Sequence, residues 1–449
     1  MGFKKDFIWG ASTAAYQIEG AAGEDGRKDS VWDVFCRTQG NVLHGDSGTV
    51  ACDHYHRFRE DVKHMAALGI KAYRFSIAWP RLIPDGIEQV NPQGAAFYNQ
   101  LINTLLEHKI TPYVTLFHWD YPQALEEKGA WANPESPYWF AAYAKTVATL
   151  FGDRVQHFIT FNEPQCFLGL GYVQGVHAPG KKLPPSQTVP MAHNIMLAHG
   201  LAVQTLRRLV PACKIGYAPC GRVTFPLHET PEDISAAKAD YFKVTENNWA
   251  GETAWFSDPV MLGEYPHAGL RFLGQYLPPN YREDLKTICQ PLDFYAQNLY
   301  NGQCITVSGG KPAYVPMPSG HPRTAMNWWV NPEVLYWGPK FLYERYQTPI
   351  FITENGMSCH DVISLDGKVH DPNRIDYLTR YLRQLKREAE DGVNVEGYFV
   401  WSLLDNFEWA LGYQERFGLI YVDYPTQKRI PKDSFYWYKK TIAENGENL

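Results

Sequence analysis

The sequence lacks the features that mark nucleic-acid-binding and membrane-spanning proteins. Its 449 residues carry a net charge of −6 and no run of five or more basic residues, so we expect no nucleic-acid partner. No stretch holds 18 consecutive apolar residues, so we expect no membrane-spanning helix and no membrane partner. The first residues, MGFKKDFIWGAST, contain neither a sustained apolar stretch nor a signal-peptide cleavage site.

Paired cysteines are missing as well. Eight cysteines lie at positions 36, 52, 166, 213, 220, 289, 304 and 359, without a CxxC pair, which argues against a zinc knuckle or a disulfide framework. Scattered reduced thiols are typical of a cytoplasmic protein, and we expect Cys166 to be an inert packing residue. The HxH pattern at 54–56 leads into a helical stretch, so we expect it to start a helix. We therefore predict no metal and no cofactor.

Aromatic residues are abundant instead. The chain has 14 Trp, 28 Tyr and 23 Phe, more than a core of this size needs. Aromatic faces commonly hold sugars and other flat apolar surfaces. A tryptophan-rich core is the alternative explanation.

Amphipathic helices alternate with short apolar strands along the chain. FYNQLINTLLEHK, for example, places Leu101, Ile102, Leu105 and Leu106 on one helical face directly before TPYVTLFHW. Alternation of this kind implies parallel strand pairing, and eight units favour closure into a barrel. An open doubly wound sheet is the alternative, but the GxGxxG turn that often follows its first strand is absent.

We therefore predict one α/β domain over residues 1–449, a (β/α)₈ TIM barrel with long βα loops. Two of the long loops are expected at 175–187 and 308–322, which are rich in Pro and Gly. The eight predicted strands lie within residues 6–13, 70–79, 111–119, 155–164, 213–220, 290–300, 348–356 and 395–405.

Two of these apolar strands end on glutamates. FITFNEP and FITENG share their first three residues and then reach Glu163 and Glu354, although carboxylates are seldom buried without a partner. In a barrel, the carboxyl ends of the strands face the active-site mouth. The other polar and aromatic residues expected at these ends are Gln17, Glu19, Arg74, Trp79, His118, Trp119, Asn162, Asn298, Tyr300, Asn355, Trp401, Glu408 and Trp409.

Two carboxyl groups facing one cavity are the minimum equipment for cleaving a glycosidic bond. One must be protonated to protonate the leaving oxygen, and the other must be ionised to attack or stabilise the anomeric carbon. Arg74 and Tyr300 are expected to contact Glu354, and the cation would keep that carboxylate ionised. Asn162 offers its amide to a sugar hydroxyl beside the reacting centre.

An ordered set of motifs runs from about residue 6 to about residue 440: AAYQIEG, YRFSIAWPR, FHWDYPQAL, TFNEP, GVHAPG, ITENG and WSLLDNFEW. This set resembles glycoside hydrolase family 1, the retaining β-glucosidases, and TFNEP together with ITENG is highly specific for it. The resemblance implies that Glu163 is the general acid/base and Glu354 the nucleophile. It also implies that Tyr300 contacts the nucleophile and that Trp328 lies on the leaving-group side. The residues that it implies hold the sugar are Gln17, His118, Asn162, Trp401, Glu408 and Trp409.

The resemblance implies a retaining exo-β-glucosidase that uses double displacement. Its partners would be terminal unphosphorylated β-D-glucosyl groups of oligosaccharides or of aryl and alkyl glycosides, with galactosyl and fucosyl groups as further candidates. Transglycosylation and cellulose degradation fit this activity, and both a monomer and a homo-oligomer remain open. Two positions depart from the family pattern: Leu299 replaces a tyrosine, and Gln165 replaces a tryptophan toward the leaving group.

Two alternative functions are weaker. A 6-phospho-β-glucosidase would present a basic side chain to the phosphate. Here Glu408 would repel a dianion, and residues 410–415 contain no lysine or arginine. A catalytically inactive sugar-binding barrel would be expected to have lost one carboxylate, and both are present.

Overall fold

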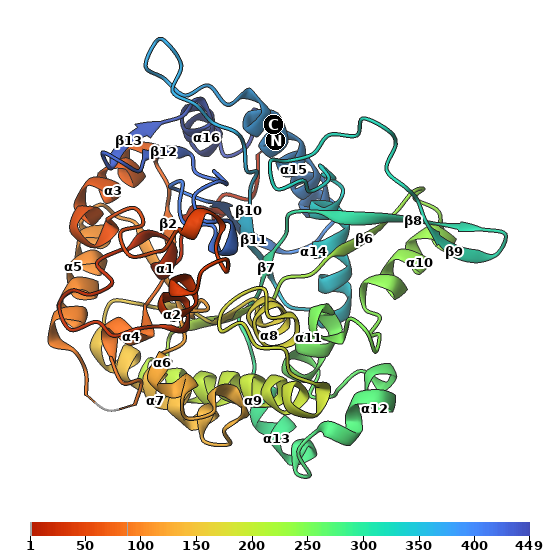
Figure 1. The fold of residues 1–449 in the computed structure, drawn as a ribbon. Coiled ribbons are helices and arrows are strands. Elements are labelled where there is room, and N and C mark those ends of the chain that lie inside the picture. Colours follow the sequence, from red (N-terminus) through yellow and green to blue (C-terminus); the bar gives the residue numbers. More distant parts are fainter. Residues whose placement is uncertain (1, 88) are drawn as a thin grey trace.

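Eight parallel strands close into a barrel in the computed structural model, which describes residues 2–87 and 89–449 (Figure 1). The order around the ring is β1-β11-β10-β7-β5-β4-β3-β2, and β1 also pairs with β2. The strands are Ile8–Ser12 (β1), Ala72–Ser76 (β2), Thr111–Phe117 (β3), His157–Asn162 (β4), Lys214–Ala218 (β5), Phe294–Asn298 (β7), Ile350–Asn355 (β10) and Val395–Trp401 (β11). The predicted barrel and its eight strands are confirmed.

A helix precedes every barrel strand after β1, and an eighth follows β11. These helices are His54–Leu68 (α3), Pro92–Glu107 (α5), Ser136–Phe151 (α7), Pro185–Leu209 (α9), Tyr281–Ile288 (α13), Val334–Tyr346 (α14), Pro372–Glu390 (α15) and Asp433–Ala443 (α16). Their apolar faces cover the barrel. Leu101, Ile102 and Leu105 of α5 are buried, but Leu106, which was predicted on the same face, is exposed. Within the described part of the chain, no helix is long and apolar enough to cross a membrane.

The connections hold further elements. The short helices are Ala15–Ile18 (α1), Val31–Arg37 (α2), Trp79–Leu82 (α4), Gln123–Glu126 (α6), Pro164–Leu168 (α8), Pro231–Tyr241 (α10), Thr253–Met261 (α11) and His267–Leu273 (α12). The additional strands are Val223–Pro226 (β6), Gly302–Ser308 (β8), Lys311–Tyr314 (β9), Ile420–Asp423 (β12) and Lys428–Pro431 (β13).

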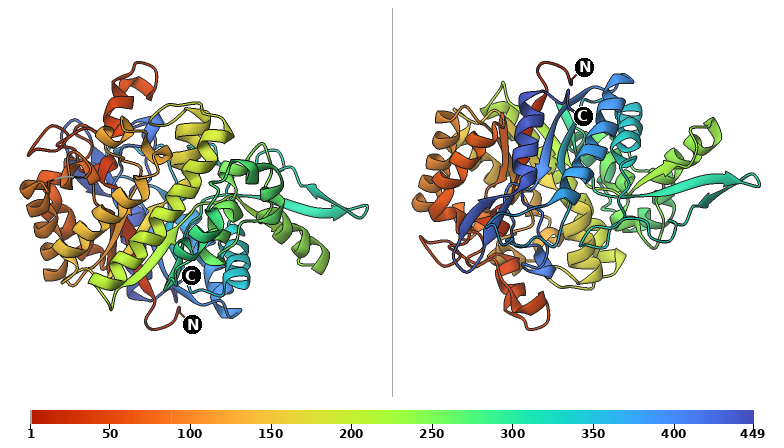
Figure 2. Two further views of the ribbon diagram at one scale, coloured as in Figure 1. Left: turned by 90° about the horizontal axis from the view of Figure 1, so that it is seen from below. Right: turned by 90° about the horizontal axis from the view of Figure 1, so that it is seen from above.

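The long loop predicted at 308–322 begins with a hairpin. Strands β8 and β9 pair as an antiparallel hairpin there, and β8 also pairs with β6. Gly309 and Gly310 form the two-residue turn with φ of 58° and 77°, which glycine adopts without steric cost. This hairpin and α10 project from one side of the barrel (Figure 2).

Large side chains fill the inside of the barrel below its mouth. Tyr113, Phe351 and Phe399 lie in one buried cluster, with ring centroids 4.9–5.5 Å apart. Such packing makes the barrel a core rather than a pore. Any cavity for a ligand must therefore lie at an end of the barrel.

Candidate active site

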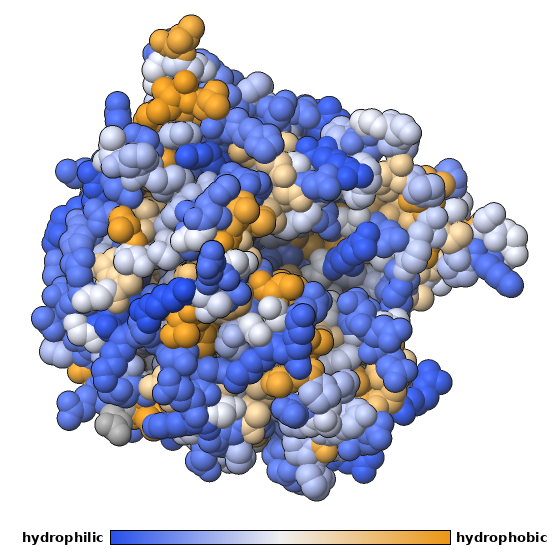
Figure 3. Space-filling model, viewed as in Figure 1, coloured by the Kyte–Doolittle hydropathy of each residue, from blue (hydrophilic) through white to orange (hydrophobic). Residues whose placement is uncertain are grey.

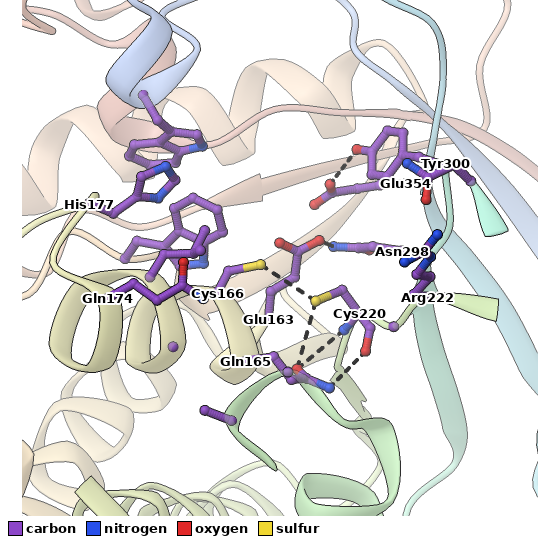
Figure 4. A pocket seen from close by; sticks show the side chains of 18 of the residues that line it. Glu163, Gln165, Cys166, Gln174, His177, Cys220, Arg222, Asn298, Tyr300 and Glu354 are labelled. Atoms are coloured by element: carbon purple, nitrogen blue, oxygen red, sulfur yellow. Dashed lines mark hydrogen bonds between the residues drawn. The ribbon is translucent and has the colours of Figure 1, made fainter. Parts of the chain in front are cut away.

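Glu163 and Glu354 lie at the carboxyl ends of barrel strands that are separated by β5 and β7. Glu354 is the last residue but one of β10, and Glu163 directly follows β4. Glu163 has φ 46° and ψ 67°, a left-handed conformation that is uncommon for residues with a side chain. Pro164 then starts α8, and proline disfavours right-handed helical geometry at the residue before it. The turn leaves the Glu163 carboxyl group in the barrel mouth (Figure 4).

Two strong donors hold the Glu354 carboxylate. Arg74 Nη1 donates to Oε1 at 2.7 Å, and the Tyr300 hydroxyl donates to Oε2 at 2.7 Å. Arg74 is 1% exposed and Glu354 4% exposed, so little solvent screens the pair. Both contacts favour the ionised carboxylate.

Glu163 has a different environment. Its Oε1 accepts a hydrogen bond of 2.8 Å from the neutral amide of Asn298. Burial, and then the negative charge of Glu354, raise the pKa of Glu163 to about 7. Burial also raises the pKa of Glu354, but the charge of Arg74 and the hydrogen bond from Tyr300 oppose that shift. The contacts therefore favour a protonated Glu163 beside an ionised Glu354.

Asn162 joins the surroundings of the two carboxyl groups. Its Oδ1 accepts from Arg74 Nη2 at 2.5 Å and from Asn298 Nδ2 at 2.9 Å. Asn298 Oδ1 in turn accepts from the Thr353 hydroxyl at 2.8 Å. Since Arg74 holds Glu354 and Asn298 holds Glu163, this buried network sets the relative placement of both carboxyl groups.

His118 extends the network toward the cavity. Its Nε2 lies 3.0 Å from the Asn162 amide nitrogen, whereas its buried Nδ1 has no partner among the described residues. Burial, and then the charge of Arg74, hold the pKa of His118 well below its usual range. The ring is therefore neutral and keeps one nitrogen available to a ligand.

Three tryptophans and His118 form an aromatic wall. Trp119 and Trp409 have ring centroids 4.5 Å apart, and His118 stacks on Trp401 at 5.9 Å. Trp119 Nε1 donates to the backbone oxygen of Asn162 at 3.0 Å, which fixes the wall to the end of β4. A second aromatic group contains Tyr300 and Trp328, 5.3 Å apart.

Two further side chains carry unpartnered buried oxygens. Gln17 Nε2 donates to Asn406 Oδ1 and to the backbone oxygen of Phe407, while Gln17 Oε1 and Glu408 Oε2 have no partner within the described residues. Burial, and then the charge of Glu354, raise the pKa of Glu408 to about 8. Buried polar atoms are seldom left unbonded, so these oxygens suit the hydroxyl groups of a ligand.

The walls enclose a cavity of about 500 Å³, visible as a hollow near the middle of the face in Figure 3. Gln17, Arg74 and Asn162 are fully or almost fully buried and lie behind its lining. The predicted site residues that line it are His118, Trp119, Glu163, Asn298, Tyr300, Trp328, Glu354, Trp401, Glu408 and Trp409.

Three residues expected at the mouth point elsewhere. Glu19 follows α1 and pairs with Arg81 Nε at 2.8 Å. Trp79 begins α4 and stacks on Tyr143, with centroids 4.6 Å apart. Asn355 bonds to the Tyr398 hydroxyl of β11. Each lies one or more residues beyond the point where the strand ends face the cavity, so the prediction that they face it is wrong.

Sequence reasoning missed one side of the cavity. This side is built by α8 and by segments near 170–177, 220–222 and 247–251. Such loops show no periodic pattern, and only the GVHAPG motif, which contains His177, and the position of Gln165 toward the leaving group pointed to them. The main residues missed are Cys166, Val173, Gln174, Cys220 and Trp249.

The HxH pattern starts a helix, as predicted. Helix α3 begins at His54, whose Nδ1 lies 2.7 Å from Asp61 Oδ2 in the interior. His56 is bonded to Asp53 at 2.6 Å on the surface. The two histidines thus have separate partners.

Comparisons with known proteins agree on one family. A profile described as "Glycosyl hydrolase family 1" matches residues 1–447. The chain is 47% identical to a 1,4-beta-D-glucan glucohydrolase of Thermotoga neapolitana, over 99% of both chains. It is also 47% identical to Beta-glucosidase A of Thermotoga maritima, over 99% of this chain and 98% of the relative. A solved structure of a Thermotoga maritima beta-glucosidase in complex with deoxynojirimycin superimposes with a TM-score of 0.91, at 45% identity over 99% of both chains.

Proposed function

The chain belongs to glycosyl hydrolase family 1, and on that premise we propose that it releases terminal unphosphorylated β-D-glucosyl groups by double displacement at Glu163 and Glu354. It is a glycoside hydrolase with β-glucosidase activity. The observation that carries the mechanism is the pair of buried carboxyl groups in one cavity. One is bonded to a cation and a phenol, and the other to a neutral amide.

In the first proposed step, ionised Glu354 attacks the anomeric carbon. Arg74 and Tyr300 hold the two carboxylate oxygens and so orient the attack. As the bond to the leaving oxygen breaks, Glu163 transfers its proton to that oxygen. The products are the free aglycone and a glucosyl ester of Glu354 with inverted configuration.

In the second step, Glu163 is ionised and takes a proton from water. The resulting hydroxide equivalent attacks the anomeric carbon, and the bond to Glu354 breaks. The second inversion restores the β configuration, and Glu163 is again protonated for the next cycle. A sugar hydroxyl in place of water would give transglycosylation by the same route.

The polar residues of the cavity suit an unphosphorylated sugar. His118 Nδ1, Gln17 Oε1 and Glu408 Oε2 are buried and unbonded among the described residues, so sugar hydroxyls can satisfy them. A phosphate would instead meet the carboxyl group of Glu408. Among the described residues that line the cavity there is no lysine, and the single arginine, Arg222, belongs to the 220–222 segment rather than to the segment of Glu408. This contrast favours the glucoside over the 6-phosphoglucoside.

The relatives named 1,4-beta-D-glucan glucohydrolase and Beta-glucosidase A support cellulose-derived oligosaccharides as substrates. The eight free thiols favour the cytoplasm, where thiols remain reduced. We propose both, together with side activity on β-galactosides and β-fucosides.

The proposed function is tested by initial rates on aryl β-glucoside, β-galactoside, β-fucoside and 6-phospho-β-glucoside, followed by NMR of the first sugar released. We expect the glucoside to react far faster than its 6-phosphate and to release β-glucose before mutarotation. Faster cleavage of the 6-phosphate, or α-glucose as first product, would contradict the proposal.

A pH profile should reveal the proton that Glu163 supplies. Because burial and Glu354 raise the Glu163 pKa to about 7, the acid is present below that pH and is lost as the pH rises through it. We expect kcat/KM for cellobiose to fall about tenfold per pH unit above pH 7, since it reports the free enzyme. With a dinitrophenyl glucoside, whose leaving group needs no proton, the same decline should be missing.

Glu408→Gln is the control for this profile, because burial and neighbouring charges also raise the pKa of Glu408 to about 8. In that variant the decline with cellobiose should persist. Equal declines for both substrates, abolished by Glu408→Gln, would assign the titration to Glu408 instead.

A further inference from the structure

Two thiols lie beside Glu163 on the side of the cavity that sequence reasoning missed. Cys166 belongs to α8 and Cys220 follows β5, and their sulfur atoms are 3.5 Å apart (Figure 4). One Glu163 carboxyl oxygen and the two sulfurs all lie within 4.8 Å of one another. Both cysteines are free. Cys166 was expected to be inert packing, but its sulfur faces a reactive group.

The spacing of the three atoms suits a shared cation. In a tetrahedral zinc site, Zn–S bonds of about 2.3 Å place two sulfurs about 3.8 Å apart. The sulfurs here need to move only a few tenths of an ångström to reach that spacing. A disulfide would require about 2.05 Å, a much larger movement.

Gln165 holds the two cysteine-bearing segments together. Its Nε2 donates to the Cys220 backbone oxygen at 2.7 Å, and its Oε1 accepts from the Cys220 backbone nitrogen at 3.4 Å. The same oxygen lies 3.9 Å from the Cys220 sulfur. The pair of thiols is therefore held in place by the residue next to Cys166.

We propose that Glu163, Cys166 and Cys220 form a binding site for a thiophilic divalent cation such as zinc or cadmium, with water as a fourth ligand. Two sulfur ligands favour such cations over magnesium or calcium. On binding, the thiols release their protons to solvent. Occupancy blocks hydrolysis, because it engages the carboxyl group that must exchange a proton with the leaving oxygen. The inhibition rests on the proposed function of Glu163, whereas the binding does not.

Cadmium binding tests the site directly through the ultraviolet charge-transfer absorbance of cadmium thiolates. The protein is reduced, freed of reductant under nitrogen, and checked in a denatured aliquot for eight free thiols. We expect one equivalent of Cd²⁺ to produce the absorbance in the wild type. Either Cys166→Ala or Cys220→Ala should abolish it, as should the serine variants, which keep the side-chain size.

Two other variants complete the binding test. Cys289→Ala removes a half-buried thiol outside the cavity and should leave the absorbance unchanged. Glu163→Gln should keep the absorbance but raise the Kd for Cd²⁺ at least about tenfold, because even the loss of an outer-shell partner has that effect. Absorbance that survives loss of either Cys166 or Cys220, or that needs Cys289, would overturn the site.

Activity provides a separate readout. Zn²⁺ should inhibit aryl β-glucoside hydrolysis by the wild type, EDTA should reverse the inhibition, and Mg²⁺ should have no effect. Relative to their own metal-free rates, Cys166→Ser and Cys220→Ser should need at least about tenfold more Zn²⁺. Full activity with cadmium bound would overturn the inhibition. Cysteine-dependent binding to a protein that hydrolyses no β-glucoside would refute the proposed function and leave the metal site standing.

Discussion

Glu354→Ala is expected to lower kcat/KM for aryl β-glucosides by about 10⁵–10⁶-fold, similar to the effect of removing a covalent nucleophile in other hydrolases. Glu354 is the carboxylate that Arg74 and Tyr300 hold at 2.7 Å. Glu163 cannot replace Glu354 as nucleophile, because Glu163 is protonated when it acts as the acid. Without Glu354 no glucosyl ester forms, so hydrolysis of cellobiose and hydrolysis of aryl β-glucosides should both be lost.

Azide or formate should restore part of the activity of Glu354→Ala. A small anion can enter the space left by the carboxylate and attack the anomeric carbon of a reactive glycoside. One displacement then occurs instead of two, so the azide product should have the α configuration. In the wild type, a 2-fluoro glucoside should label the peptide that contains Glu354, as mass spectrometry would show. A label on another peptide would exclude Glu354 as nucleophile.

Tyr300→Phe is the matched control. It removes one hydrogen bond to Glu354 but keeps the nucleophile, so azide should not accelerate it. Loss of a single preorganised donor typically costs about 10²–10³ in rate, which is well below the loss expected for Glu354→Ala. If azide rescued both variants equally, the effect would not report the missing nucleophile.

The strand ends explain why much of this site could be predicted from the sequence. Parallel strands in a closed ring bring their carboxyl ends together, so Glu163 and Glu354 had to share one mouth once the barrel was recognised. The structure also places Arg74 and Tyr300 against Glu354. Short apolar runs and period-3.6 patterns are local properties of the chain, and they correctly predicted the barrel strands and the helices that precede them.

The residues that were misplaced or missed lie in the connections beyond the strand ends. Glu19 and Trp79 were expected at the mouth, but α1 and α4 begin there and turn them toward Arg81 and Tyr143. Cys220 lies against Cys166, and the neighbouring Gln165 bonds to the Cys220 backbone. Contacts between loops that are distant in sequence leave no periodic signal, so this wall could not be predicted.

Glu163→Ala is expected to separate the two steps of the reaction. A sugar leaving group needs a proton, so kcat/KM for cellobiose should fall by about 10²–10⁴-fold, the usual contribution of general acid catalysis. A dinitrophenolate leaves without a proton, so its release in the first turnover should be nearly as fast as in the wild type. Stopped-flow absorbance would record that burst.

The second step should then become slow for every substrate, because no base remains to activate water. The glucosyl ester of Glu354 should accumulate, and kcat and KM for the dinitrophenyl glucoside should fall together. Azide needs no base, so it should attack the ester and restore turnover. This attack is the second of two inversions, so the product should be the β-glucosyl azide, opposite in configuration to the product from Glu354→Ala.

Asn298→Ala is the control that distinguishes the acid from its surroundings. Asn298 donates to Glu163 Oε1 at 2.8 Å. Its loss should lower kcat/KM for both substrates without creating a burst or a response to azide. If Glu163→Ala behaved in this way, with equal losses on cellobiose and on the dinitrophenyl glucoside and no azide product, Glu163 would be a binding residue. A residue that merely binds the glucosyl group meets the same sugar in both substrates, so its loss should lower both rates equally. Different losses for cellobiose and the dinitrophenyl glucoside therefore require that the Glu163 proton moves in the transition state.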